Sequence, residues 1–377
     1  MEIFFNSKML LQIMKTAAKV INQKSPLPIL GDFLFEYKGG GVMIVTSSNG
    51  EQWLSQKLNV TSEEEAEFRF CVQTSNLLNT IGNLGDVTVH MSVDKDSNMV
   101  CCRYGNGEFS VPYEDAEEYP SPNMNNSDSI DLILNAKKVL KAIETTGYAT
   151  ANDELRPVMN GIHFDFLADG MVCVGADKTW LVRYKDNTIT REDDGTTPEF
   201  TLPKGSANVL MSVLSSVDDD IKITFNKESL FVSNSNFKLS ARLLEYRYPN
   251  YNAVIPKDSK ITITADRVCL INALKRVIPM SNDLSNLVEF DFKQGQLTIS
   301  ASNIDFNKSA SETVTCDCDS EIKIGFKGSS VLEVLKNIND DNIVIELSEP
   351  NRAGVFYSAF EYTRDEYLSL CMPMQLI

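Results

Sequence analysis

The stretch Arg156-Pro157-Val158-Met159-Asn160-Gly161-Ile162-His163-Phe164-Asp165-Phe166 decides the fold, because its surroundings are repeated along the chain. A segment with the apolar spacing of an amphipathic helix, 135–148, comes before it. Within the stretch, an isoleucine and two phenylalanines alternate with other residues, as in a strand with one buried face. A glycine-containing turn then leads to a second alternating run at 171–177. We therefore predict a helix followed by strands.

The same order of elements occurs in two other parts of the chain. The corresponding helix and strand runs are 7–21, 29–37 and 42–46 near the N-terminus, and 265–278, 287–292 and 297–300 in the last third. Each copy continues with a second helix between strands, and these helices are 74–81, 204–214 and 327–338. The repeat interval of about 125 residues is an ordinary domain size. Such repeats predict an α+β chain of three similar domains, each with two helix-plus-strands units.

Two segments rich in turn-forming residues separate the copies. They are 119–127, which contains two prolines and four asparagine or serine residues in its second half, and 248–252, with the sequence Tyr-Pro-Asn-Tyr-Asn. We therefore place the domains at 1–125, 126–252 and 253–377.

The composition is that of a soluble globular protein. Of 377 residues, 43% are hydrophobic and 23% are charged. No run approaches the roughly 18 apolar residues of a membrane helix, and we expect no signal peptide in the first residues. The eight cysteines lie mostly in strand-like runs without the paired spacing of a zinc site. We expect a reduced, cytoplasmic protein with no metal and no cofactor.

Positive charge is concentrated on predicted helices, although the net charge of the whole chain is −17. In the first helix, the lysines at 8, 15 and 19 fall opposite the apolar side, and no acidic residue lies between Lys8 and Lys24. Lys137, Lys138 and Lys141 likewise oppose the apolar side of the second copy's first helix. A basic surface of this kind binds phosphates by releasing counterions, without reading base sequence. We therefore predict contact with a nucleic-acid backbone.

Motifs for other chemistry are missing from the sequence. It contains no G-x-x-x-x-G-K-[ST], G-x-G-x-x-G, H-E-x-x-H or G-x-S-x-G. We interpret Asp218-Asp219-Asp220 as a solvated turn, and His90 and His163 as members of strand alternation, so no catalytic residues are predicted.

Four short segments, in this order and spacing, resemble the bacterial DNA polymerase III β subunit, the replicative sliding clamp. They are Pro26-Leu27-Pro28-Ile29-Leu30-Gly31, 156–161, Tyr248-Pro249-Asn250-Tyr251 with Val254-Ile255-Pro256, and Met372-Pro373-Met374-Gln375-Leu376. The resemblance covers the full length. It implies three domains of the DNA-clamp fold, each a pair of β-α-β-β-β units, and two subunits closed head to tail into a ring with helices inside and sheets outside.

The resemblance also implies roles for individual residues. Lys24 and Arg156 match the family's DNA-facing positions, and the lysines of the predicted helices complete the predicted contacts to double-stranded DNA: Lys15, Lys19, Lys137, Lys138, Lys141 and Lys204. The predicted groove for partner peptides comprises Met159, Asp177, Trp180, Leu181, Pro249, Val254, Met372, Pro373, Met374 and Leu376. The predicted dimer interface comprises Phe109, Val111, Pro279 and Met280.

This chain departs from the usual pattern beside the predicted groove. Many clamps have Thr-Asp-Gly-His-Arg-Leu where residues 176–181 read Ala-Asp-Lys-Thr-Trp-Leu, and an arginine where Ala253 stands. With Trp180 in place of a guanidinium, we expect a bulkier, less polar pocket and an altered peptide preference.

The sequence thus predicts a non-enzymatic clamp, loaded by an ATP-driven clamp loader, that tethers the DNA polymerase III α subunit and other proteins carrying clamp-binding motifs. Two alternatives stay open: a clamp-like hub that binds peptides without being loaded on DNA, and a metal-dependent nucleic-acid hydrolase that uses the acidic clusters.

Overall fold

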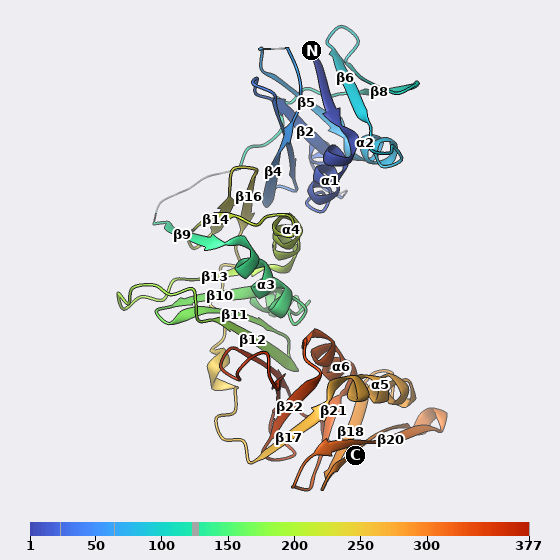
Figure 1. Ribbon diagram of the computed structural model, residues 1–377, viewed down its shortest axis with the longest axis vertical. Coiled ribbons are helices and arrows are strands. Elements are labelled where there is room, and N and C mark those ends of the chain that lie inside the picture. Colours follow the sequence, from blue (N-terminus) through green and yellow to red (C-terminus); the bar gives the residue numbers. More distant parts are fainter. Residues whose placement is uncertain (23, 64, 123–127, 377) are drawn as a thin grey trace. The chain divides into compact units, whose positions relative to one another are not determined.

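The computed structural model describes residues 1–22, 24–63, 65–122 and 128–376. Within these ranges one unit, β-α-β-β-β, occurs six times in succession, twice in each of the three predicted copies (Figure 1). All the strand pairs in the described ladders are antiparallel, so the chain has the predicted α+β class. None of the described helices is long and apolar enough to cross a membrane.

The first copy forms its own apolar core. Its elements are β1 (Glu2–Asn6), α1 (Ser7–Ala17), β2 (Asp32–Tyr37), β3 (Val42–Ser48), β4 (Gln52–Asn59), β5 (Phe68–Gln73), α2 (Thr74–Ile81), β6 (Thr88–Asp94), β7 (Met99–Tyr104) and β8 (Gly107–Pro112). The predicted strand at 29–37 begins later, because Pro28 opens a short 3-10 helix, η1 (Pro28–Gly31). On α1, Leu10 and Met14 are buried in this core, and each such side chain contributes about 1.5–3 kcal/mol.

The second copy repeats the order. Its elements are β9 (Ile130–Asn135), α3 (Ala136–Gly147), β10 (Gly161–Leu167), β11 (Gly170–Ala176), β12 (Trp180–Asp186), β13 (Glu199–Pro203), α4 (Lys204–Leu214), β14 (Asp220–Phe225), β15 (Ser229–Ser233) and β16 (Phe237–Arg242). A 3-10 turn, η2 (Pro157–Asn160), precedes β10 as η1 precedes β2.

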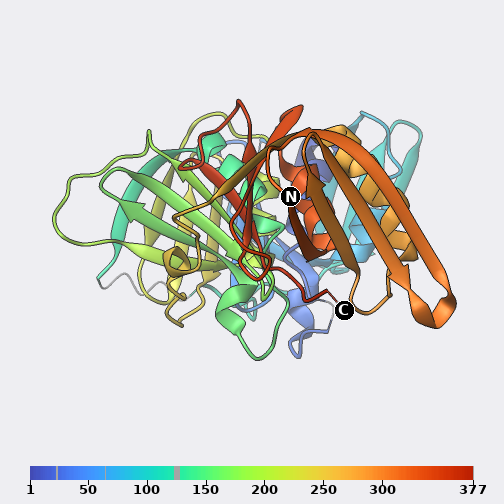
Figure 2. The same cartoon turned by 90° about the horizontal axis from the view of Figure 1, so that it is seen from below.

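The third copy has the same order again. Its elements are β17 (Ile261–Asp266), α5 (Arg267–Val277), β18 (Leu287–Lys293), β19 (Gln296–Asn303), β20 (Lys308–Asp317), β21 (Ile322–Lys327), α6 (Gly328–Asn337), β22 (Asn342–Leu347), β23 (Gly354–Ser358) and β24 (Tyr367–Cys371). Figure 2 shows the orange strands of this copy, β18 to β20, running side by side. The helices α5 and α6 contact each other.

Strand pairing joins the copies into larger sheets. The last strand of the second copy, β16, pairs with β4, and the last strand of the third copy, β24, pairs with β12. Residue contacts accordingly divide the chain into two compact units, 1–140 with 202–245 and 141–201 with 246–377. The predicted central domain is therefore shared between the two units. The predicted boundary at residue 125 lies outside the described residues, so the domain limits stay a prediction.

Candidate functional site

The first predicted phosphate-binding surface lies on α1 and α4, which contact each other. The Asn6 side chain caps α1 by accepting a hydrogen bond from the backbone N–H of Met9. With Leu10 and Met14 buried on the opposite side, Lys15 is exposed. Beyond the helix end, Lys19 Nζ donates a 2.6 Å hydrogen bond to Ser212 Oγ on α4.

The first residue of α4, Lys204, is also exposed. The structure therefore places Lys15 on α1 and Lys204 on α4, two contacting helices, and Lys19 in the turn just after α1.

The lysines of α3 are less available than the sequence implies. Lys137 Nζ lies 2.7 Å from Asp218 Oδ1, and Lys141 Nζ lies 5.6 Å from the centroid of the Tyr362 ring. Lys138 is half-buried. An exposed ion pair such as Lys137–Asp218 is weak, so a phosphate can replace Asp218 as the partner of the lysine. Without such a ligand, the aspartate reduces the positive potential around α3.

Lys24 and Arg156 precede the 3-10 turns of the first and second copies at different distances along the chain. Both are exposed, and Lys24 comes four residues before η1, whereas Arg156 comes directly before η2. Neither belongs to a helix, so their position follows from the turn rather than from helical periodicity.

Several of the predicted groove residues lie in or beside one apolar cluster. Met159 and Leu181 pack in one cluster with Tyr248 and Tyr251. This cluster continues through Ala353 and Ile255 into a hollow of about 990 Å³ that Val254 and Met372 also line. Pro249 is exposed between the two tyrosines.

The C-terminal segment lines a second hollow of about 650 Å³. Pro373, Met374 and Leu376 lie on this side, and Glu349 and Asn351 line both hollows, so the two adjoin. The segment is held at two points. The N–H of Met372 donates to the Thr179 carbonyl at 2.7 Å, and that of Met374 donates to the Gly325 carbonyl at 2.7 Å.

Only a glycine at position 325 lets the backbone of Met374 come this close to the strand. A Cβ there would lie 2.7 Å from the Met374 carbonyl oxygen, which is too close for any side chain.

The structure does not bring Trp180 together with Leu181. Neighbouring residues of a strand point to opposite faces, and the Trp180 ring packs edge-on against Tyr148 at 5.4 Å, beside the core of the third copy. Trp180 therefore packs against the core of the third copy and is not part of the apolar cluster that contains Met159 and Leu181. Asp177, in the turn before β12, is half-buried and its N–H donates to the Trp180 carbonyl.

A buried polar network supports the groove wall, and the sequence analysis missed it. The His163 ring stacks on Tyr248 at 4.4 Å, and the Tyr251 hydroxyl donates to Asp165 Oδ2 at 2.6 Å. Burial raises the pKa of Asp165, but hydrogen bonds from His163 and Tyr251 outweigh burial, and the net shift is downward. A histidine two residues from an aspartate, with both side chains on one strand face, was the available signal.

The predicted dimer-interface residues lie at two places that differ in exposure. Val111 is buried in the core of the first copy, because it faces the helix side of β8, so it is not free to meet a partner. Phe109 is half-buried against Tyr104. Pro279 is exposed and Met280 is half-buried in the 3-10 turn η4 (Ile278–Met280).

Near η4 the structure exposes three large apolar side chains that sequence reasoning did not select. Leu284, Ile304 and Phe306 are 94%, 90% and 65% exposed. Their segments are tied to η4, because β19 and β20 contact it and Asn303 Nδ2 donates to the Ser281 carbonyl. Exposed apolar groups gathered in this way are typical of an association surface.

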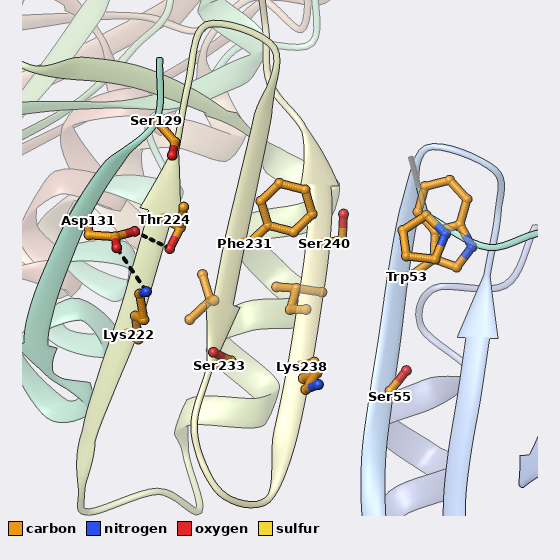
Figure 3. A pocket seen from close by; sticks show the side chains of 13 residues that line it. Trp53, Ser55, Ser129, Asp131, Lys222, Thr224, Phe231, Ser233, Lys238 and Ser240 are labelled. Carbon is orange, nitrogen blue, oxygen red and sulfur yellow. Dashed lines mark hydrogen bonds and ion pairs between the residues drawn. The ribbon is translucent and has the colours of Figure 1, made fainter. Parts of the chain in front are cut away.

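A further hollow of about 380 Å³ lies on the sheet formed by β4, β16, β15, β14 and β9 (Figure 3). Trp53 and Phe231 line it together with Lys222 and Asp131. The two charges neutralise each other, since Lys222 Nζ lies 2.8 Å from Asp131 Oδ2. None of the predicted site residues lines this hollow.

Comparison with known proteins identifies three consecutive family matches. The N-terminal, central and C-terminal domains of the DNA polymerase III beta subunit match residues 1–125, 133–250 and 252–374. The beta sliding clamp of Streptococcus pneumoniae serotype 4 is 25% identical over 381 residues, covering 98% of both chains. That of Haemophilus influenzae is 23% identical over 377 residues, covering 100% of both.

Solved structures show the same fold. DNA polymerase III beta subunits from Pseudomonas aeruginosa and Thermotoga maritima each superpose with a TM-score of 0.90 at 21% identity over 100% of both chains. A P. aeruginosa sliding clamp bound to griselimycin superposes with a TM-score of 0.91 at 20% identity over 100% of both chains.

Proposed function

Since the chain belongs to the DNA polymerase III beta subunit family, we propose that two copies close head to tail into a ring that encircles duplex DNA. The protein is a DNA sliding clamp, a non-catalytic processivity subunit. In the proposed ring, three domains per chain, divided at 125 and 252, place their helices on the inside. A closed ring holds a polymerase on its template without reading any base.

The observation that supports DNA contact is the basic surface of α1 and α4. In a chain with a net charge of −17, Lys15 and Lys204 lie on two contacting helices, and Lys19 lies in the turn that follows the first of them. Lysines on a surface of this kind release counterions when they approach phosphates, which gives affinity without sequence preference. Lys24 and Arg156, exposed beside η1 and η2, extend the proposed contacts. On α3, Lys138 and Lys141 are further proposed phosphate contacts. Lys137 can contact a phosphate after its ion pair with Asp218 breaks.

The exposed apolar side chains near η4, those of Leu284, Ile304 and Phe306, support the proposed closure of the ring. We assign Leu284, Ile304 and Phe306, with Pro279 and Met280, to the subunit interface, opposite the partner's edge strand β8, which carries Phe109. Burial of about 25 cal/mol per Å² of apolar surface stabilises such a contact. Val111 would support the interface only from within its own core.

The two adjoining hollows support a peptide groove. Val254 and Met372 line one hollow, and Pro373, Met374 and Leu376 line the other. Met159 and Leu181 belong to the apolar cluster that adjoins the first hollow, in which Leu181 is buried. Aliphatic and aromatic anchors of a short peptide fit such surfaces. We assign the groove to the DNA polymerase III α subunit, the clamp loader and other proteins with clamp-binding motifs, in the cytoplasm.

The decisive experiment compares retention on circular and linearised DNA after loading by the clamp loader, together with the mass of the free protein. A dimer that stays on the circle and leaves through free ends supports the ring. A monomer, or equal loss from both DNAs, refutes it and favours the peptide hub.

A second experiment tests the groove. A peptide from the polymerase should bind the protein, and Met372→Asp should abolish binding while leaving the fold intact, because Met372 is 43% exposed. Substitution of Trp180 by arginine tests the predicted change in peptide preference. Because the indole of Trp180 packs on Tyr148, we expect Trp180→Arg to lower stability more than it changes peptide affinity.

A further inference from the structure

Three side chains with metal-ligating atoms converge beside strand β10. His163 Nε2 lies 3.0 Å from Asp165 Oδ1 and 3.6 Å from Glu199 Oε2. The three ligand atoms all lie within 4.8 Å of one another. His163 and Asp165 come from β10 and Glu199 from β13, so two elements of the sheet hold them in place.

We propose that His163, Asp165 and Glu199 form a site for a divalent transition metal, with Zn²⁺ as the best-fitting ion. Zinc binds histidine nitrogen and carboxylate oxygen at about 2.0–2.2 Å. An ion at that distance from each ligand lies between atoms separated by roughly 3–4 Å. Both distances from His163 Nε2 have this spacing, and the two carboxylate oxygens lie within 4.8 Å of each other. Imidazole and carboxylate ligands together suit zinc better than magnesium or calcium, which prefer oxygen alone.

The groups around the three ligands are those that a metal site requires. His163 Nδ1 lies 3.0 Å from the buried Thr201 hydroxyl, which can accept the N–H of that nitrogen. The Nε2 lone pair is then directed at the metal. The other oxygen of Asp165 accepts the hydrogen bond of Tyr251, so this carboxylate is held in orientation as well.

Burial limits access to one side. His163 is 3% exposed and Asp165 is 7% exposed, whereas Glu199 is exposed. An ion can therefore reach the site past Glu199, and a water molecule on that side can complete a tetrahedral set.

The same geometry permits a metal-free arrangement, in which Nε2–H donates to Asp165 and Nδ1 accepts from Thr201. The two arrangements place the imidazole proton on different nitrogens. When the ion binds to neutral His163, the proton leaves Nε2 and the Nδ1–H tautomer forms, so no net proton is released from that tautomer exchange. The protonation of Nε2 therefore distinguishes the two states.

A bound ion would stabilise one wall of the groove. His163 stacks on Tyr248, and Asp165 binds Tyr251. The segment between these tyrosines carries Pro249, and Val254 follows it. The metal site itself needs neither the ring nor DNA, so it can fail while the proposed function stands, and the reverse also holds.

The test uses the full chain, freed of metal by a chelator and titrated with ZnCl₂. The chain has only two histidines, so ¹⁵N-histidine NMR resolves the ring nitrogens of His163 from those of His90. His90 is an internal control, because among the described residues its Nε2 forms an ion pair with one carboxylate, that of Glu2, at 3.6 Å. We expect one equivalent of Zn²⁺ per chain, with loss of the proton on His163 Nε2 and an unchanged His90.

Glu199→Gln is the informative variant, because Glu199 is exposed and its removal leaves the fold in place. We expect it to weaken zinc binding at least about 10-fold, since even outer partners of a metal site cost that much. Glu192→Gln, an exposed glutamate in the preceding loop, is the matched control and should bind as the unaltered chain does. Absence of stoichiometric uptake, a response of His90 alone, or full affinity in Glu199→Gln would overturn the site.

Discussion

The hydroxyl of Tyr251 donates a 2.6 Å hydrogen bond to Asp165, which joins the segment after β16 to strand β10. This bond explains why a tyrosine belongs in the Tyr-Pro-Asn-Tyr segment. The carboxylate it satisfies is buried, and a buried carboxylate without partners is costly.

Tyr251→Phe removes the hydroxyl and leaves the ring in its apolar cluster. We expect a loss of about 1–3 kcal/mol in the free energy of unfolding, because Asp165 loses one hydrogen-bond donor while it stays buried. Denaturant titration measures this loss. Tyr246→Phe is the matched control, since Tyr246 is 67% exposed in the same segment, and it should change stability little. Equal stability of the two variants would contradict the role assigned to Tyr251.

Lys15→Glu should shorten the lifetime of the loaded protein on circular DNA. Lys15 is exposed on α1 within the proposed phosphate-binding surface, and each phosphate that the protein no longer neutralises reduces the slope of log affinity against log salt by about 0.9. Lys227→Glu makes the same change in net charge at an exposed turn between β14 and β15. A lifetime reduced equally by both variants would mean that net charge, and not this surface, controls retention.

The paired substitution Ile304→Ser and Phe306→Ser should shift the protein from dimer to monomer at micromolar concentration. Both side chains are largely exposed in one chain and are assigned to the interface, so the isolated subunit should keep its stability. Phe360→Ser is the control, because Phe360 is 81% exposed in the turn between β23 and β24. Sedimentation velocity measures the masses. A double variant that stays dimeric would exclude this part of the interface.

Asp32→Asn should stabilise the protein at neutral pH. Burial, and secondarily the charge of Glu114, raise the pKa of Asp32 from 3.8 to about 6. The folded protein then holds this proton more tightly than the unfolded chain, so the contribution to stability is full below about pH 4 and is lost as pH rises through about 6.

The asparagine imitates the protonated form and avoids that loss. The melting temperature of Asp32→Asn should therefore exceed that of the unaltered protein above pH 6, and the difference should vanish below about pH 4. Asp96→Asn, at an exposed turn, should follow the unaltered protein throughout. A constant difference at every pH would show that ionisation of Asp32 is not its cause.

The sequence by itself determined the repeated β-α-β-β-β unit, because helical and strand periodicities are local and each copy carries them independently. The helices at 74–81 and 204–214 were predicted to the residue. Where a local cue was overlooked, the prediction was wrong: Pro28 turns residues 28–31 into a 3-10 helix ahead of the strand. The resemblance rests on short motifs that are likewise readable in one dimension.

Only the tertiary structure decided which side chains share a surface. Strand alternation turned Trp180 away from Leu181 and toward Tyr148, and it buried Val111 in its own core. The pairings β16 with β4 and β12 with β24 made sheets that pass through the predicted domain limits. Glu199 meets His163, 36 residues away along the chain, because two strands from different units of the repeat lie side by side. Contacts of that kind depend on sheet register and burial, which a single sequence does not display.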